Sequence, residues 1–283
     1  MVDLRPLEFR RATFDWGRTY LMGVVNVTPD SFSDGGAFAG DADAAIRHGF
    51  ALFAEGADIV DVGGESTRPG AAAVAVDAEV ARVAPVVRAL AERGVVSIDT
   101  CKAAVAEAAI AAGAEIVNDV SGGALDADIL RVTAQTGAVL VIGHLRGTPA
   151  DMNDRADYGD VTRDVLNELT HRVDIAVAAG IARHRLLVDP GLGFAKHPAH
   201  NVELLARLGE LRALGCPVVV GASRKSFLGR LTGRDVGERE FATAAADTAA
   251  VLHGANVVRV HDVARQRDAV IVADAIKRAS CTR

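Results

Sequence analysis

Short apolar runs recur along the chain and alternate with longer segments in which apolar residues follow a helical spacing. The runs are YLMGVVNV (20–27), DIVDVG (58–63), VVSID (95–99), EIVND (115–119), AVLVIGH (138–144), RLLVDPG (185–191), PVVVGAS (217–223) and VVRVHD (257–262). Each is almost continuously apolar and rich in β-branched residues, which is typical of parallel strands buried on both faces. Helices are predicted between them, for example over 77–94 and 160–180. Five glycines that precede strands are predicted to close helices, namely Gly94, Gly113, Gly137, Gly180 and Gly215.

The alternation of eight strands with helices predicts an α/β protein with parallel strands. A count of eight favours a closed (β/α)8 TIM barrel over an open doubly wound sheet. No linker or low-complexity stretch interrupts the pattern, so we expect residues 20–283 to form one barrel domain. Residues 1–19 are expected to form an N-terminal extension, with a short hairpin over 8–19 that plugs the bottom of the barrel.

The composition excludes several classes of protein. Half of the 283 residues are hydrophobic and 24% are charged, which argues against disorder. A net charge of −6 offers no basic surface for nucleic acid, and no apolar run approaches the length of a membrane span. The start of the chain lacks the apolar region of a secretory signal. Cys101, Cys216 and Cys281 are scattered, which predicts reduced thiols in a cytoplasmic protein.

Lysine is rare in this chain. Among 31 Lys and Arg residues, lysine stands only at positions 102, 196, 225 and 277. Lys225 lies in GASRKSFLGR, directly after an apolar run, and a lysine retained against such a bias is a candidate for chemistry that needs a compact point charge. On composition alone, however, chance placement at a helix start is the better explanation.

Carboxylate and amide groups end three of the predicted strands. Asp99 ends the third, Asn118 lies at the end of the fourth, and Asp189 ends the sixth. Active sites of such barrels lie at the carboxyl ends of the strands. A carboxylate can accept two parallel N–H bonds, and an amide both donates and accepts, so the three side chains suit a flat nitrogen heterocycle.

Cations end two further strands. Lys225 follows the seventh strand, and Arg259 and His261 lie at the end of the eighth. These residues suit a phosphate group, with Asn26 at the end of the first strand as a neutral oxygen ligand for Mg²⁺. The joint pattern predicts a small substrate, a nitrogen heterocycle that carries a diphosphate leaving group.

A structural explanation has weight for any one of these residues. An Asp after a strand is more often a helix cap than a catalyst, and Asp119 and Asp262 are expected to be caps or loop partners. Cys101 is expected to be a small buried thiol rather than a nucleophile. The sequence contains no GxSxG, HExxH or Walker motif. The combination of strand ends therefore carries the prediction.

With these residues in hand, the sequence resembles the bacterial dihydropteroate synthases, the sulfonamide targets of folate synthesis. The resemblance rests on GVVNVTPDSFSDGG, DIVDVGGESTRPGA, SIDT, IVNDVSGG, DPGLGFAKHPAHN, GASRKSFLG and RVHDV, in strand order from about residue 21. It implies a TIM barrel, usually a homodimer. The implied reaction joins p-aminobenzoate to 6-hydroxymethyl-7,8-dihydropterin diphosphate and releases diphosphate.

The resemblance also implies roles for the strand-end residues. Asp99, Asn118, Asp189 and Lys225 would bind the pterin ring, and Asp99, Asp189 and Lys225 would be the catalytic residues. It implies that the leaving diphosphate is stabilised by Mg²⁺ and cations before the aniline nitrogen attacks, in a dissociative mechanism. Lys225 would then be a point charge between the two substrates.

Two further groups of residues follow from the same resemblance. The implied diphosphate-binding residues are Asn26, which also binds Mg²⁺, Arg68, Arg259 and His261. The implied p-aminobenzoate-binding residues are Ser31, Phe32, Thr67, Pro69 and Ser226.

The sequence departs from the usual family pattern at a few positions. The fifth strand reads VIGHLRG where the family often has Met-His-Met-Gln-Gly, so Gly143 and Leu145 replace methionines and Arg146 replaces a glutamine. Ala195 stands where glycine is common, and Cys101 occupies a small polar position. A methyltransferase of the same superfamily and a non-catalytic pterin-binding paralogue are the alternative predictions. The motifs SRK and RVHD favour a diphosphate substrate over the methyltransferase, and the intact polar set with STRPG argues against the non-catalytic paralogue.

Overall fold

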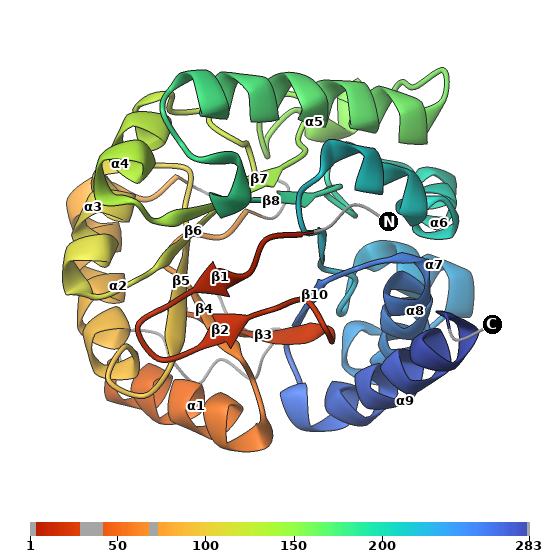
Figure 1. Ribbon diagram of the computed structural model, residues 1–283, viewed down its shortest axis with the longest axis horizontal. Coiled ribbons are helices and arrows are strands. Elements are labelled where there is room, and N and C mark those ends of the chain that lie inside the picture. The colour runs from red at the N-terminus through yellow and green to blue at the C-terminus, as the bar shows by residue number, and fades with distance from the viewer. Residues whose placement is uncertain (1–3, 29–41, 68–72, 282–283) are drawn as a thin grey trace.

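The computed structural model describes residues 4–28, 42–67 and 73–281 of the chain. Within this part, eight parallel strands form one sheet that curls into a barrel, as predicted (Figure 1). The strands are β3 (Tyr20–Asn26), β4 (Ile59–Gly63), β5 (Val95–Asp99), β6 (Ile116–Asp119), β7 (Val139–Gly143), β8 (Leu186–Asp189), β9 (Val219–Val220) and β10 (Val257–Val260). Each lies inside one of the eight apolar runs.

Helices surround the barrel on its outer side (Figure 1). They are α1 (Ala42–Glu55), α2 (Val76–Leu90), α3 (Ala103–Ala112), α4 (Asp128–Thr136), α5 (Val161–Ala178), α6 (Pro198–Ala206), α7 (Ser226–Thr232), α8 (Glu240–His253) and α9 (Val263–Cys281). Short 3-10 turns cover Met152–Arg155, Arg183–Arg185, Leu208–Leu214 and Val236–Glu238. Local signals begin some helices: the Asp160 side chain accepts from the Arg163 amide at the start of α5, and Pro198 opens α6.

The barrel closes between β8 and β9 through a short contact. The strand order is β8-β7-β6-β5-β4-β3-β10-β9, and Val188 forms a single parallel bridge with Val218. Pro217 lacks an N–H to extend this pairing, although its carbonyl accepts from the Val188 amide at 3.0 Å. The seventh strand is therefore much shorter than its apolar run suggests.

Two apolar layers lie on opposite sides of the strands. The larger layer packs the outward side chains of the strands against the helices. The smaller layer fills the lower interior of the barrel and includes Leu7 and Phe14 from the N-terminal segment, together with Tyr20 and Met22. Burying side chains of this size contributes roughly 1.5–3 kcal/mol each.

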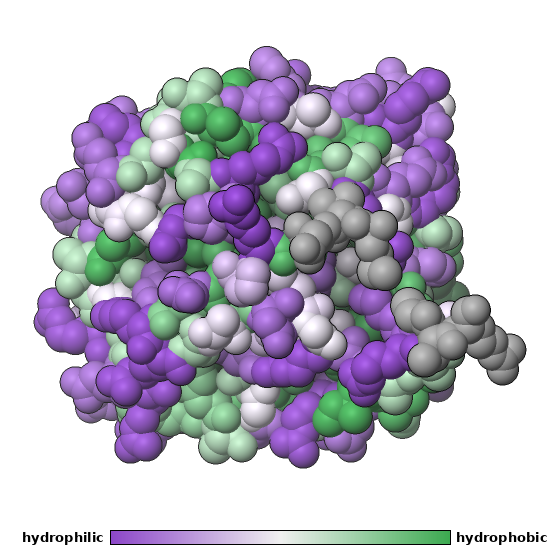
Figure 2. All heavy atoms as spheres, in the orientation of Figure 1, coloured by the Kyte–Doolittle hydropathy of each residue, from purple (hydrophilic) through white to green (hydrophobic). Residues whose placement is uncertain are grey.

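The N-terminal hairpin covers one end of the barrel, as predicted. Strands β1 (Leu7–Glu8) and β2 (Thr13–Phe14) pair antiparallel, and in Figure 1 they lie across the centre of the ring. The Phe14 ring stacks on Tyr20 at a centroid distance of 4.0 Å. Figure 2, in the same orientation, shows a mostly hydrophilic face with smaller apolar groups. Among the described residues, no helix combines the length and apolar character needed to cross a membrane.

Four of the five predicted helix-closing glycines have positive φ, namely Gly113, Gly137, Gly180 and Gly215. The prediction for Gly94 is wrong, because α2 ends at Leu90 and Gly94 is not among the residues with positive φ. A Cβ atom at Gly94 would instead lie 2.5 Å from the Phe53 ring. Close packing against α1 therefore explains this glycine.

Candidate active site

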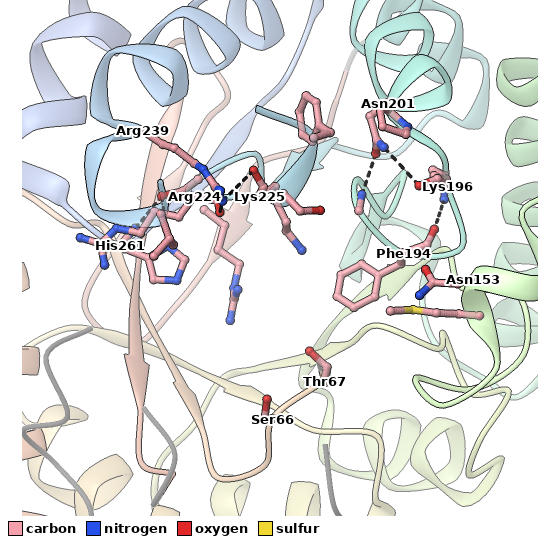
Figure 3. A pocket seen from close by; sticks show the side chains of 18 of the residues that line it. Ser66, Thr67, Asn153, Phe194, Lys196, Asn201, Arg224, Lys225, Arg239 and His261 are labelled. Carbon is pink, nitrogen blue, oxygen red and sulfur yellow. Dashed lines mark hydrogen bonds between the residues drawn. The ribbon is translucent and has the colours of Figure 1, made fainter. Parts of the chain in front are cut away.

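A cavity of about 940 Å³ opens at the carboxyl ends of the strands. It is bordered by strand ends, by the segments after β4 and β8, and by the start of α7. Figure 3 shows side chains on two sides of it and at its base. The lining residues are Asn26, Thr28, Glu65, Ser66, Thr67, Asp99, Met152, Asn153, Gly193, Phe194, Lys196, His197, Pro198, Asn201, Ser223, Arg224, Lys225, Ser226, Phe227, Arg230, Val236, Arg239, Arg259 and His261.

Strand register brings three of the predicted polar residues to one level of the barrel. Asn26 pairs with Gly63, Gly63 with Asp99, and Asp99 with Asn118 across β3 to β6. Gly143 likewise pairs with Asp189 between β7 and β8. Asn118 itself pairs with Val141, so Asp189 lies two positions further along its strand than this row. The side chains therefore meet without help from the loops.

Arg259 links the carboxylates of Asp61 and Asp99. Its Nε donates to Asp61 Oδ2 at 2.6 Å and its Nη2 donates to Asp99 Oδ2 at 2.7 Å. Asn118 Nδ2 also donates to Asp61 Oδ2, at 2.9 Å. Burial raises the pKa of Asp99, although the Arg259 guanidinium opposes this rise. Asp99 Oδ1 has no hydrogen-bond partner among the described residues and remains able to accept an N–H from a ligand.

Asp189 and Lys225 lie on the next side of the site. Asp189 Oδ1 accepts from the Gly191 amide at 2.7 Å, and burial raises the pKa of this carboxyl group. Lys225 directly precedes α7, and its Nζ lies 4.0 Å from the centroid of the Phe194 ring. The aromatic face therefore supports the ammonium group at the edge of the cavity.

The segment from Ser223 to Ser226 supplies further polar groups. Ser223 Oγ lies 3.0 Å from His261 Nδ1, which connects the ends of β9 and β10. Arg224 has a φ of 58°, and its carbonyl accepts from Arg239 Nη1 at 3.0 Å. Figure 3 shows Arg224, Lys225, Arg239 and His261 on one side of the cavity. This side is strongly cationic and suits an anionic ligand.

The opposite side of the cavity contains a chain of hydrogen bonds. Lys196 Nζ lies 2.9 Å from His144 Nδ1, and His144 Nε2 lies 3.0 Å from Glu168 Oε2. Burial lowers the pKa of His144 to about 4, so its ring is neutral near pH 7. Nδ1 must then accept from Lys196 while Nε2–H donates to Glu168. Burial also lowers the pKa of Lys196, to about 7.

The departures from the usual pattern of the fifth strand have a local explanation. A Cβ atom at Gly143 would lie 2.5 Å from Val120 Cα, so a methionine does not fit this backbone arrangement. Leu145 instead packs with Met152 and Ala195 in a small separate apolar cluster. Arg146 has its own partners: its Nε donates to Glu168 Oε1 at 3.0 Å, and its guanidinium lies 3.8 Å from the Tyr158 ring centroid.

Most predicted site residues in the described part of the chain line the cavity, namely Asn26, Thr67, Asp99, Lys225, Ser226, Arg259 and His261. Asn118 and Asp189 do not appear in its lining: Asn118 pairs with Asp99 and donates to Asp61, and Asp189 ends β8. Ser31, Phe32, Arg68 and Pro69 lie outside the described residues. Arg259 was predicted to face an anion and here contacts two carboxylates, so its anion-binding role stays a prediction.

The residues predicted to be structural have such contacts. Asp119 accepts from the Ser121 amide and hydroxyl and from the Gly123 amide, which shapes the turn after β6. Asp262 accepts from the Arg265 amide at the start of α9. Cys101 is half-buried, and burial raises the pKa of its thiol far above the ordinary value. A protonated thiol is a poor nucleophile, in agreement with the structural prediction.

Sequence reasoning missed several groups around the cavity. Asp61 lies inside an apolar run rather than at its end, although a charged residue within a buried strand is itself a signal. The rarity of lysine in this chain could have marked Lys196 as a candidate site residue. Phe194 and Arg239 had none, since one lies in a loop and the other between α7 and α8.

A magnesium ion would find one suitable protein oxygen here. Asn26 ends β3 and lines the cavity. Among the described residues, no three His, Cys, Asp or Glu side chains form a metal-binding group. A single amide oxygen fits a Mg²⁺ ion that takes its remaining ligands from water and substrate phosphate.

A family model described as "Pterin binding enzyme" matches residues 22–261. A dihydropteroate synthase from Synechocystis is 43% identical over 277 residues, which is 96% of each chain. The chain belongs to the dihydropteroate synthase family. The Yersinia pestis dihydropteroate synthase, solved in a sulfonamide drug complex, is 41% identical with a TM-score of 0.92, over 97% of this chain and 100% of that one. A dihydropteroate synthase from Xanthomonas albilineans, solved with 4-aminobenzoic acid, is 44% identical with a TM-score of 0.89, over 96% and 98%.

Proposed function

We propose that this protein catalyses the dihydropteroate synthase reaction. It would condense 6-hydroxymethyl-7,8-dihydropterin diphosphate with p-aminobenzoate to give 7,8-dihydropteroate and diphosphate. The observation that carries this proposal is one cavity lined by Asn26, Asp99, Lys225, Arg259 and His261 in a member of this family. The relatives solved with 4-aminobenzoic acid and with a sulfonamide drug support it.

The pterin ring would bind among the acceptors at the strand ends. Asp99 Oδ1 and Asp189 can accept its N–H donors, and Asn118 and Lys225 complete the group. Both carboxylates are largely shielded from solvent, so an unpaired ring donor beside them would be costly, which favours a ligand with matching N–H groups. Asp99, Asp189 and Lys225 are the proposed catalytic residues.

The diphosphate would bind on the cationic side of the cavity. Arg259 lies in β10 and His261 directly follows that strand, and Asn26 would hold Mg²⁺ together with diphosphate oxygens. A bound Mg²⁺ ion would neutralise charge on the leaving group. Arg68 is a further proposed diphosphate ligand from the sequence. Arg259 would have to exchange part of its contact with Asp99 for the anion.

The p-aminobenzoate would bind between the segment after β4 and the start of α7. Thr67 and Ser226 line the cavity, and the Phe194 ring on the opposite side offers an apolar face. Figure 3 shows Thr67 across the open space of the cavity from Lys225, on the side of the segment after β4. Ser31, Phe32 and Pro69 are proposed to complete this subsite on sequence grounds.

The proposed reaction is dissociative. The C–O bond to diphosphate breaks first, and the resulting cation is conjugated with the dihydropterin. The neutral aniline nitrogen then forms the C–N bond and loses one proton. Such a reaction asks the protein to stabilise a leaving anion and exclude water, rather than to supply a strong base.

Diphosphate release from the pterin diphosphate tests the proposal, with and without p-aminobenzoate and Mg²⁺. We expect 7,8-dihydropteroate and diphosphate in equal amounts only when both substrates and Mg²⁺ are present. Binding of the pterin with no product under any condition would favour a non-catalytic pterin-binding protein. Assembly as a homodimer and a cytoplasmic location remain predictions of the sequence.

A further inference from the structure

One lysine holds both ends of the segment between β4 and α2. Lys102 Nζ lies 3.0 Å from Glu65 Oε2 and 2.7 Å from Glu79 Oε2, and it donates to the Val74 carbonyl at 2.6 Å. An ammonium group has three protons, and here three oxygens surround it. We call Lys102, Glu65, Glu79 and Val74 the Lys102 cluster.

The cluster joins two successive strand–helix units, β4–α2 and β5–α3. Glu65 follows β4, Val74 lies just before α2, and Glu79 lies in the first turn of α2. Lys102 stands between β5 and α3. The two ends of the segment also contact each other, because the Val74 amide donates to Glu65 Oε1 at 2.6 Å. The side chains of Glu65 and Lys102 therefore hold Val74 close to the residues that follow β4.

The opposite charges of Lys102 and the two glutamates hold the Lys102 cluster together. The Glu79 side chain is fully buried, and its second oxygen accepts from Thr100 Oγ1 at 2.9 Å. Burial alone would lower the pKa of Lys102, but its bonds to Glu79 and Glu65 raise that pKa above its ordinary value. A buried carboxylate needs its cation, so the lysine remains charged and in place.

We propose that Lys102 is a positioning residue for the aminobenzoate subsite. By fixing Glu65, it determines where Ser66 and Thr67 lie, and these three residues line the cavity (Figure 3). Lys102 itself is not among the described residues that line it. The inference rests on the proposed function, which assigns Thr67 to p-aminobenzoate. The pterin-binding groups are held on the strands and depend less on this segment.

Arginine cannot take the place of this lysine. Its guanidinium presents donors in one plane, whereas the cluster surrounds a single nitrogen with acceptors from three segments. This requirement gives Lys102 a reason to remain in a chain where arginine is the usual cation. Lys102→Arg therefore tests geometry while it preserves charge.

The experiment compares KM for the two substrates in three variants. Lys102→Arg and Glu65→Gln should each raise KM for p-aminobenzoate about tenfold, which is the loss of about one charged hydrogen bond. The KM for the pterin diphosphate should stay close to the wild-type value. Asp77→Asn removes an exposed carboxylate from the first turn of α2 outside the cluster, and should change neither KM.

Calorimetric titration of a sulfonamide into each variant saturated with pterin, diphosphate and Mg²⁺ provides a readout besides turnover. We expect an affinity loss of the same order in Lys102→Arg and Glu65→Gln. If the wild type is active, two results would overturn this inference but not the proposed function. They are equal KM increases for both substrates in Lys102→Arg and Glu65→Gln, or no increase in either variant. An inactive wild type would overturn the proposed function and this inference with it.

Discussion

The charges at the strand ends depend on each other at the level of single residues. Arg259 bonds to both Asp61 and Asp99, so one guanidinium sets the position of two carboxylates. A ligand that binds Asp99 Oδ2 must compete with this guanidinium, whereas Oδ1 has no partner among the described residues. Asp61 gives the guanidinium a second partner, which lets Arg259 release Asp99 without becoming unpaired. Asp61 does not line the cavity, but it bonds to Arg259, which does.

Asp61→Asn should weaken pterin binding. The amide would hold Arg259 and Asn118 less strongly, and Arg259 would remain on Asp99, the proposed pterin ligand. Loss of a hydrogen bond to a charged group costs about 1.5–3 kcal/mol, or roughly 10- to 100-fold in affinity. Calorimetry with a pterin ligand would measure the loss. Ser97→Ala is the matched control, because Ser97 pairs with Asp61 across β4 and β5 and its buried hydroxyl lacks a partner among the described residues. Equal affinities in wild type and Asp61→Asn would contradict the prediction.

Removal of Mg²⁺ should weaken the binding of ligands that carry a diphosphate, and of no others. Asn26 offers a single oxygen, so the ion would depend on diphosphate for its other ligands. A chelator should weaken binding of the pterin diphosphate strongly and leave binding of a pterin without phosphates nearly unchanged. Calorimetry with both ligands compares the two losses. A similar loss for both would indicate a structural metal, or no metal at Asn26.

At the scale of elements, the barrel could be predicted because its signal is local. Each of the eight strands of the barrel lies in its own apolar run of the sequence. The strand-end residues of the site follow from the same pattern. Arg239, Phe194 and the Lys102 cluster could not be predicted, because their positions depend on how loops and helices pack. Gly94 was misassigned because sequence alone does not separate a left-handed glycine from one in close contact with a neighbouring ring.

The pairing of β6 and β7 provides a test at this scale. Gly143→Met, which restores the residue common in the family, should lower the free energy of unfolding by about 1–3 kcal/mol. Its Cβ would meet the Val120 backbone at 2.5 Å, and backbone yields less readily than a side chain. Urea unfolding measures the change. Leu145→Met, a volume-conserving replacement in the adjacent apolar cluster, should cost less than about 1.5 kcal/mol. Equal stability of both variants would mean that Val120 moves freely.

Across the whole molecule, the two ends of the barrel differ in polarity: one is apolar and covered, and the other carries the polar cavity. One end is closed by the hairpin, whose aromatic residues extend the lower core. The other end gathers buried charges around the cavity, where their burial costs stability that the core must offset. The separation lets the polar site persist without opening the apolar interior to water.

Asp247 is a buried acid outside this site, and it should control how stability changes with pH. It lies on α8, is fully buried, and neither carboxylate oxygen has a hydrogen-bond partner among the described residues. Burial raises its pKa from 3.8 to about 8. The folded state therefore binds this proton more tightly than the unfolded state does. Its contribution to stability is fully present below about pH 4 and is lost as pH rises through about 8.

Asp247→Ala should remove this dependence. The stability of the variant relative to wild type should rise with pH between about 4 and 8, by up to about 1.4 kcal/mol per pH unit. Urea unfolding at several pH values measures the difference, so that other titrating groups cancel. Asp268→Ala, which removes an exposed acid on α9, is the matched control. A constant difference between Asp247→Ala and wild type across this range would show that Asp247 titrates alike in both states. Asp247 would then have to gain a partner or water in solution, since an isolated carboxylate in this core cannot keep its ordinary pKa.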